Sequence, residues 1–259
     1  MLDQAQLDDL HGRGWTTVAG VVAPGEVESM LDLVWDFLES RGLVRDDPTT
    51  WPETVGKLQP LRKAGVFDPF LGPALDAIAD QLMGAGRWTS LNTRPQALIT
   101  MPFIGPWQLP HKVWHLDLPG RAPTEGLAAV RYFGLLDDVD PRGGGTLVVE
   151  GSHELVRRMV AANPERDAGS SSDLRKQLRQ HEFFARLAQP NPDTAEFMDT
   201  GAVIDGVKVR VGELTGRAGD LVVMHPWLMH NIAMNASNRP RIAMSHSAYT
   251  TDVSFYGGG

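Results

Sequence analysis

The strongest constraint on the fold is a change in hydrophobic pattern near Trp88. Before this point, apolar residues recur at helical spacing, and Pro24 opens a strong amphipathic segment that ends near Gly42. After it, short apolar runs alternate with turns rich in Gly, Pro and Asp, and only residues 154–199 return to a helical pattern. Many short strands with such turns favour a sandwich or barrel. The chain is therefore predicted to be mainly β, with flanking helices and a helical insertion.

The individual elements follow from the same patterns. Helices are expected at 2–11, 24–42, 70–83, 152–162 and 173–188, with a polar linker at 169–172 and Ser152 as an N-cap. Residues 46–60 are expected to form a loop. Strands are expected at 15–22, 89–102, 114–119, 127–136, 146–150, 207–214, 220–224, 227–230 and 242–249.

Length and charge narrow the possible partners. A chain of 259 residues can form one large domain, and its net charge of -8 lacks the basic footprint that nucleic acids or anionic lipids require. It has no cysteine, which excludes thiolate metal sites and cysteine nucleophiles. The N-terminus does not resemble a signal peptide, and no apolar run is long enough to cross a membrane. We therefore expect a cytoplasmic monomer or homodimer that acts on a small molecule, without a nucleic-acid or membrane partner.

The motif WHLDLP contains the first candidate metal ligands. If this segment is extended, His115 and Asp117 point to the same side of the strand. An imidazole and a carboxylate on one face supply two of the three ligands in a two-His-one-carboxylate site, which suits ferrous iron. By itself such a pair is weak evidence for a metal, because neighbouring His and Asp residues often form only a hydrogen bond at the surface.

The downstream run GDLVVMHPWLMHNIAMNASNRPRIAMS supplies the other candidates. His230 ends an apolar run, as expected for a ligand that reaches inward, and is favoured over His225, which could be a hydrogen-bonded histidine at a strand end. Arg241 lies in an apolar strand, where a guanidinium is costly unless it meets an anion such as a carboxylate. Arg239 beside a proline is interpreted as a solvated turn residue.

Together, HLD, GGGTLVVEGSH and HNIAMNASNRPRIAMS resemble the phytanoyl-CoA dioxygenase family of iron(II)- and 2-oxoglutarate-dependent oxygenases. The resemblance covers about 88–249, with a looser match in LHGRGWTTVAGVVAPGEV. It implies a double-stranded β-helix (jelly-roll, cupin-like) in a single domain over 1–259. Residues 1–87 would be its helical support, and 88–250 its core with the insertion 154–199. Glu150 stands where many members have proline before the GSH turn, a departure that touches no proposed ligand.

The resemblance also implies site residues and cofactors. His115, Asp117 and His230 would be the catalytic metal ligands for Fe(II), and Arg241 would bind the distal carboxylate of the cosubstrate 2-oxoglutarate. O2 would be the oxidant, with release of succinate and CO2. Related halogenases have Gly or Ala in place of the metal carboxylate, so Asp117 implies hydroxylation or a related oxidation.

Further contacts are expected around this centre. A family member uses a Gln from the strand before the metal motif, and the similar run QALIT nominates Gln96 and Thr100 for the cosubstrate, together with Thr146. Residues 102–114 precede the metal motif and offer candidates for the substrate pocket, although each could equally pack in the core: Trp107, Gln108, His111 and Trp114.

The insertion could be a lid, with Phe183, Phe184 and Arg186 as candidates, or a packing or dimer contact. The expected substrate is a small metabolite, such as an amino-acid derivative or a natural-product intermediate. The alternatives are a cupin-like metal-dependent isomerase or hydrolase, which would not need Arg241, and a jelly-roll binding protein without catalysis.

Overall fold

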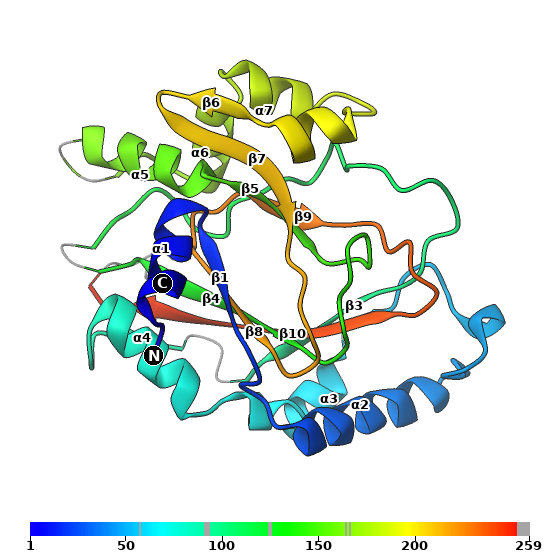
Figure 1. Cartoon of the computed structure of the whole chain (residues 1–259). Coiled ribbons are helices and arrows are strands. Elements are labelled where there is room, and N and C mark those ends of the chain that lie inside the picture. The colour runs from blue at the N-terminus through cyan, green and yellow to red at the C-terminus, as the bar shows by residue number, and fades with distance from the viewer. Residues whose placement is uncertain (57, 91–93, 124–125, 164, 166, 253–259) are drawn as a thin grey trace.

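The computed structural model describes residues 1–56, 58–90, 94–123, 126–163, 165 and 167–252. It contains two antiparallel sheets that face each other (Figure 1). The larger sheet has the order β1 (Trp15–Val18), β8 (Leu221–Met224), β4 (Ala129–Leu135) and β10 (Arg241–Thr250). The far edge of β10 pairs with β3 (Gln96–Thr100) along one half and with β2 (Trp88–Thr89) at its end. The smaller sheet has the order β6 (Ala202–Ile204), β7 (Val207–Glu213), β5 (Thr146–Glu150) and β9 (His230–Ile232).

Helices cover the outer faces of both sheets (Figure 1). The N-terminal group packs against the larger sheet and consists of α1 (Gln4–Gly12), α2 (Pro24–Glu39), α3 (Gln59–Ala64) and α4 (Pro73–Met83), with short 3-10 helices at Pro48–Thr50 and Asp68–Phe70. The insertion covers the smaller sheet with α5 (Ser152–Ala162), α6 (Ser171–Leu178) and α7 (Glu182–Leu187), followed by a π-helical turn at Glu196–Thr200. No helix among the described residues is both long and apolar enough to span a membrane.

The alternation of strand side chains separates the outer cores from the space between the sheets. Val130 and Tyr132 of β4 pack with the N-terminal helices, while Phe133 belongs to a third cluster between the sheets. In β10, the outward Ile242 and Met244 pack with the same helices. Arg241 and the residues at even steps from it therefore face the interior, which leaves polar groups inside the jelly-roll.

The predicted order of helices, strands, helical insertion and strands is present, but several elements differ from the prediction. The prediction of a strand at 114–119 is wrong. Within this segment only His115 forms a β-bridge, to His230, and the chain bends at Asp117. The strand expected at 227–230 begins only at His230, because Trp227 lies in a turn whose N–H donates to His225 Nδ1.

The helical elements also differ in detail. Gly151 is the N-cap of α5 in a left-handed conformation (φ 80°), and the hydroxyl of Ser152 instead accepts from Met229 N at 2.9 Å. The helix expected at 173–188 is divided into α6 and α7, and the one expected at 70–83 begins at Pro73. The loop expected at 46–60 contains a 3-10 turn and the start of α3. In the strand expected at 89–102, residues 91–93 lie outside the described residues, and β2 and β3 occupy the two ends.

Candidate metal centre

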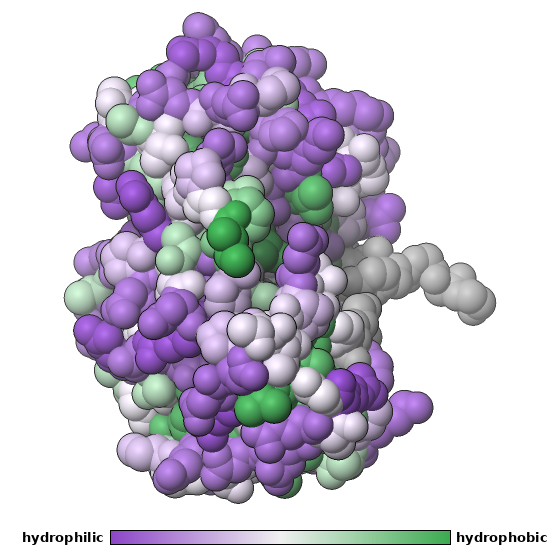
Figure 2. Space-filling model, turned by 90° about the vertical axis from the view of Figure 1, so that its right-hand side faces the viewer, coloured by the Kyte–Doolittle hydropathy of each residue, from purple (hydrophilic) through white to green (hydrophobic). Residues whose placement is uncertain are grey.

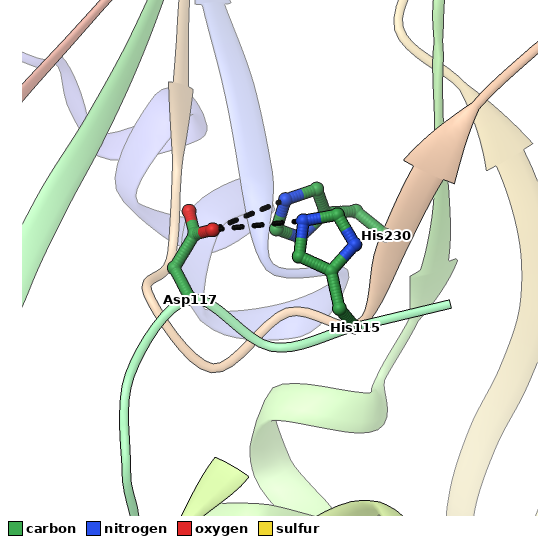
Figure 3. A group of neighbouring side chains, drawn as sticks. All are labelled: His115, Asp117 and His230. Carbon is green, nitrogen blue, oxygen red and sulfur yellow. Dashed lines mark ion pairs between the residues drawn. The ribbon is translucent and has the colours of Figure 1, made fainter. Parts of the chain in front are cut away.

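Three potential ligands from distant segments meet at one end of the interior (Figure 3). His115 and His230 exchange two backbone hydrogen bonds of 3.1 and 3.0 Å, which place their rings side by side with centroids 4.1 Å apart. Asp117 Oδ1 lies 3.7 Å from His115 Nε2 and 3.6 Å from His230 Nε2. One ligand atom from each residue therefore falls within 4.8 Å of the other two.

The hydrogen bonds of both imidazoles leave their Nε2 atoms available as ligands. His115 Nδ1 lies 3.0 Å from Val113 O, and His230 Nδ1 lies 2.9 Å from Leu228 O. A carbonyl only accepts, so each Nδ1 carries the proton and each Nε2 offers a lone pair toward Asp117. Val113 adopts a left-handed backbone conformation (φ 66°), which is energetically costly for a β-branched residue. Such strain persists only where the surrounding structure holds the backbone in place.

The ionisation states also suit a metal site. Burial lowers the pKa of His230 to about 4, against the opposing influence of Asp117, so this imidazole is neutral at pH 7. Burial would raise the pKa of Asp117, but His230, Arg131 and His115 outweigh it and the pKa is lowered. The site therefore presents a neutral imidazole at His230 beside an ionised carboxylate at Asp117.

This donor set fits an octahedral ferrous ion. Ligand bonds of about 2.1 Å would place adjacent ligand atoms about 3 Å apart, so the observed spacing of Asp117 Oδ1 needs to contract by only several tenths of an ångström. Three protein ligands leave coordination positions for a cosubstrate and oxygen.

Arg241 lies in the interior with little exposure to solvent. The side chain is 5% exposed, and its Nε donates to Gly144 O at 2.8 Å. Burial lowers the pKa of Arg241 to about 10, so the guanidinium is charged at pH 7. The negative charge of Glu213 opposes this shift. The carboxylate oxygens of Glu213 accept hydrogen bonds from the backbone N–H groups of Arg142 and Gly145. A buried cation of this kind favours an anionic ligand.

The residues nominated for the cosubstrate line the same interior. Thr146 is 8% exposed and borders a narrow cavity together with Arg241. Thr100 lies directly opposite Arg241 in the β3–β10 pair, and Gln96 lies opposite Ser245. All of these residues lie on inward-facing positions.

The four substrate candidates do not share one environment. Trp114 is 2% exposed and packs in the core beneath the insertion, so we leave it out of the substrate surface. Trp107 is half-buried and donates to Met234 O, Gln108 is exposed, and His111 lines an open groove against α7.

The lid candidates and the surface near the site can also be placed. Phe183 and Phe184 are buried in the core beneath the insertion, as the packing alternative requires, and Arg186 pairs with Glu196 at the surface.

One face of the molecule is mostly hydrophilic, with small separate apolar patches (Figure 2). Ile104 in the segment before the metal motif is fully exposed.

His225 lies apart from the three ligands. Its Nδ1 accepts from Trp227 N at 3.1 Å, and its ring lies 4.9 Å from that of His153. Arg239 is exposed and donates to Asp138 O, as expected for a turn residue. The geometry therefore groups His230, and not His225, with the HxD motif.

Sequence reasoning missed three residues at or near the centre. Arg131 projects from β4 toward Asp117, with Nε 3.7 Å from Asp117 Oδ2. Asn231 Nδ2 donates to Lys112 O and ties the loop before the metal motif to β9. Asn235, fully buried, donates to Thr100 O and Arg239 O and fixes the turn before β10. Arg131 had a visible signal as a charge inside an apolar run, and both asparagines lie in the run HNIAMNASNRPRIAMS that carries the family resemblance.

Comparison with known proteins adds a family and a fold. The family profile described as phytanoyl-CoA dioxygenase (PhyH) matches residues 10–243. An L-proline trans-4-hydroxylase of Streptomyces griseoviridis is 29% identical over 172 residues, which are 66% of this chain and 58% of that protein. The chain thus spans less than two thirds of the length of this relative.

Solved structures share the architecture. AviO1 from Streptomyces viridochromogenes Tue57 aligns with a TM-score of 0.59 at 18% identity, over 98% of both chains. HygX from Streptomyces hygroscopicus, solved with nickel and 2-oxoglutarate bound, aligns with a TM-score of 0.54 at 16% identity, over 99% of this chain and 90% of its own. These likenesses confirm the predicted fold class.

Proposed function

The chain belongs to the phytanoyl-CoA dioxygenase family, and from this premise we propose that it is an Fe(II)- and 2-oxoglutarate-dependent dioxygenase that hydroxylates a small molecule. His115, Asp117 and His230 would hold the iron. The observation that carries the proposal is the convergence of these residues, with both Nδ1 atoms committed to backbone carbonyls and both Nε2 atoms directed at the carboxylate.

Arg241 would anchor the distal carboxylate of 2-oxoglutarate, next to Thr146 and within reach of Thr100 and Gln96. When bound, iron and the keto acid would supply the activation of oxygen. The protein's own groups would orient the cosubstrate and shield it from water. Asp117 completes the ligand set, which supports hydroxylation over halogenation.

We propose an amino-acid derivative or a natural-product intermediate as the substrate. The proline hydroxylase relative supports an amino-acid-like substrate, and the negative net charge disfavours a polyanionic one. Trp107, Gln108 and His111 remain the proposed substrate contacts, because the segment that carries them leads into the metal motif.

The test is anaerobic addition of Fe(II) and 2-oxoglutarate to the full chain, followed by visible spectroscopy. A weak charge-transfer band of the chelated keto acid is expected in the wild type and in His225→Ala, and it should be lost in His230→Ala. Retention of the band in His230→Ala with loss in His225→Ala would refute the ligand assignment. A metabolite screen for substrate-stimulated succinate formation, with mass spectrometry for one added oxygen, would then identify the substrate.

A further inference from the structure

Arg131 is a charged residue in the middle of an otherwise apolar strand of the larger sheet. Its strand β4 is hydrogen-bonded to β8 on one side and to β10 on the other, so its backbone position is fixed. Its Nη1 donates to Ser247 Oγ at 3.0 Å, and its Cζ lies 5.4 Å from the centre of the Phe133 ring. The guanidinium is therefore held in place by two neighbours from the sheet interior.

Arg131 Nε and Asp117 Oδ2 face each other without a hydrogen bond. Both atoms are shielded from solvent, and within the described part of the chain neither has a hydrogen-bond partner. They lie 3.7 Å apart, and an N–H···O bond of about 2.9 Å would require an approach of about 0.8 Å. Because a buried polar atom without a hydrogen-bond partner is unfavourable, closing this gap stabilises the site.

The two oxygens of Asp117 have different surroundings. Oδ1 faces the Nε2 atoms of both histidines, whereas Oδ2 faces Arg131. We propose that Arg131 is a positioning residue of the metal centre, whose Nε–H holds Oδ2 so that Oδ1 alone is presented to the metal. This inference rests on the proposed function, because the ligand role of Asp117 is part of it.

The charge of Arg131 cannot account for such a role. A cation beside a divalent ion repels it, so the positive charge alone would weaken metal binding. A role that depended on charge would instead concern an anionic group of the substrate or cosubstrate. The hydrogen-bond donor at Nε and the charge therefore make opposite predictions and can be tested separately.

Two substitutions separate them. Lysine keeps the charge but has a methylene group where arginine has Nε, whereas glutamine has an amide nitrogen at that position and no charge. Arg131→Lys thus removes the donor at the Nε position and leaves only the ammonium one atom further out, whereas Arg131→Gln keeps a donor at that position. Arg210→Lys is the matched control, because Arg210 Nε donates to Glu150 at 2.6 Å in the other sheet and neither residue belongs to the ligand cluster.

The experiment is a titration of the full chain with Ni(II) against a competing chelator, together with visible spectra of the Co(II)-loaded protein. Arg131→Lys is expected to weaken Ni(II) affinity about 10- to 100-fold, the usual effect of losing the partner of a ligating carboxylate. It should also change the Co(II) spectrum. Arg131→Gln and Arg210→Lys should stay close to the wild type. Because Arg131 acts through Asp117, Arg131→Lys should have no further effect in an Asp117→Gly background.

Other results overturn the inference. If Arg131→Lys binds Ni(II) as tightly as the wild type, the charge of Arg131 and not its Nε–H donor is what matters. The same conclusion follows if turnover of 2-oxoglutarate is impaired in Arg131→Gln alone. An equal loss in the Asp117→Gly background would show that Arg131 does not act through Asp117. If Arg131→Lys fails to fold by circular dichroism, Ser247→Ala loosens the same guanidinium and should weaken Ni(II) binding by a smaller factor. A wild type that binds no Ni(II) would refute the proposed function, and the inference with it.

Discussion

Arg241→Met removes the guanidinium that we propose binds the distal carboxylate of 2-oxoglutarate, while a side chain of similar length remains in the strand. Arg241 is 5% exposed, and its charge persists at pH 7 although burial lowers its pKa to about 10. Among the described residues its hydrogen-bond partner is Gly144 O, and Glu213 acts on it only through space. An incoming carboxylate would therefore meet a charged donor that is poorly hydrated.

Loss of one partner from such a buried charge pair costs about 2–5 kcal/mol. At about 1.4 kcal/mol per tenfold change, the affinity for 2-oxoglutarate should fall between about 30-fold and several thousandfold. The loss of the bond to Gly144 O adds about 1 kcal/mol of destabilisation, but this term does not depend on the ligand.

The assay compares 2-oxoglutarate with 2-oxopentanoate, which has the same keto-acid head and a methyl group in place of the distal carboxylate. Anaerobic titration of the Fe(II) protein should show that Arg241→Met loses affinity for 2-oxoglutarate and keeps its affinity for 2-oxopentanoate. Arg239→Met is the control, because Arg239 is exposed and two residues away. An equal loss for both keto acids would assign Arg241 a structural role, and no loss for either would move the cosubstrate elsewhere.

Three further predictions concern a proposed ligand, two buried histidines outside the ligand set, and the backbone beside the metal motif. Asp117→Gly should abolish hydroxylation in a coupled succinate assay, and normal turnover would refute its role as a ligand. Burial lowers the pKa of His153 and of His225, so the unfolded chain takes up protons first as the pH falls below about 6.5. For each histidine, the free energy of unfolding should then fall by up to about 1.4 kcal/mol per pH unit, until the pH reaches the pKa of that histidine in the folded protein. Urea unfolding at pH 7 and pH 5 should show this loss, and His153→Gln should reduce it. Val113→Asn should stabilise the protein by about 1 kcal/mol in thermal melting with unchanged metal affinity, because asparagine tolerates the left-handed backbone at this position.

The grouping of the three proposed ligands could be inferred from the sequence, although the local structure around them could not. Alternation in a strand was the expected reason for His115 and Asp117 to share a side, yet the chain pairs only at His115 and bends at Asp117. The grouping holds because the backbone pair between His115 and His230 sets the two rings together, and the bend returns the carboxylate toward them. The residue types and their order in the chain were enough to identify the candidate ligands, whereas the path of the backbone between them depends on tertiary contacts.

Other features of the site have no signal in the sequence. The carbonyls of Val113 and Leu228 select the tautomers of the two histidines, and any residue type could supply a carbonyl. The burial of Trp114 depends on helices of the insertion, the first of which begins 38 residues later at Ser152, so its neighbourhood could not be foreseen from the motif beside it.

The two interior arginines could both have been found by one rule, since each is a guanidinium in an apolar strand. The rule identified Arg241, where a proline and a polar turn precede the strand, but LAAVRYFGLL was interpreted only as buried. Arg131 lies opposite Ser247, six residues beyond Arg241 in β10, so the two backbone positions are about 20 Å apart at about 3.3 Å per residue. In the proposed site, Arg241 binds the cosubstrate and Arg131 holds the carboxylate of the metal centre. Their substitution should accordingly give separable effects, on cosubstrate affinity for Arg241 and on metal coordination for Arg131.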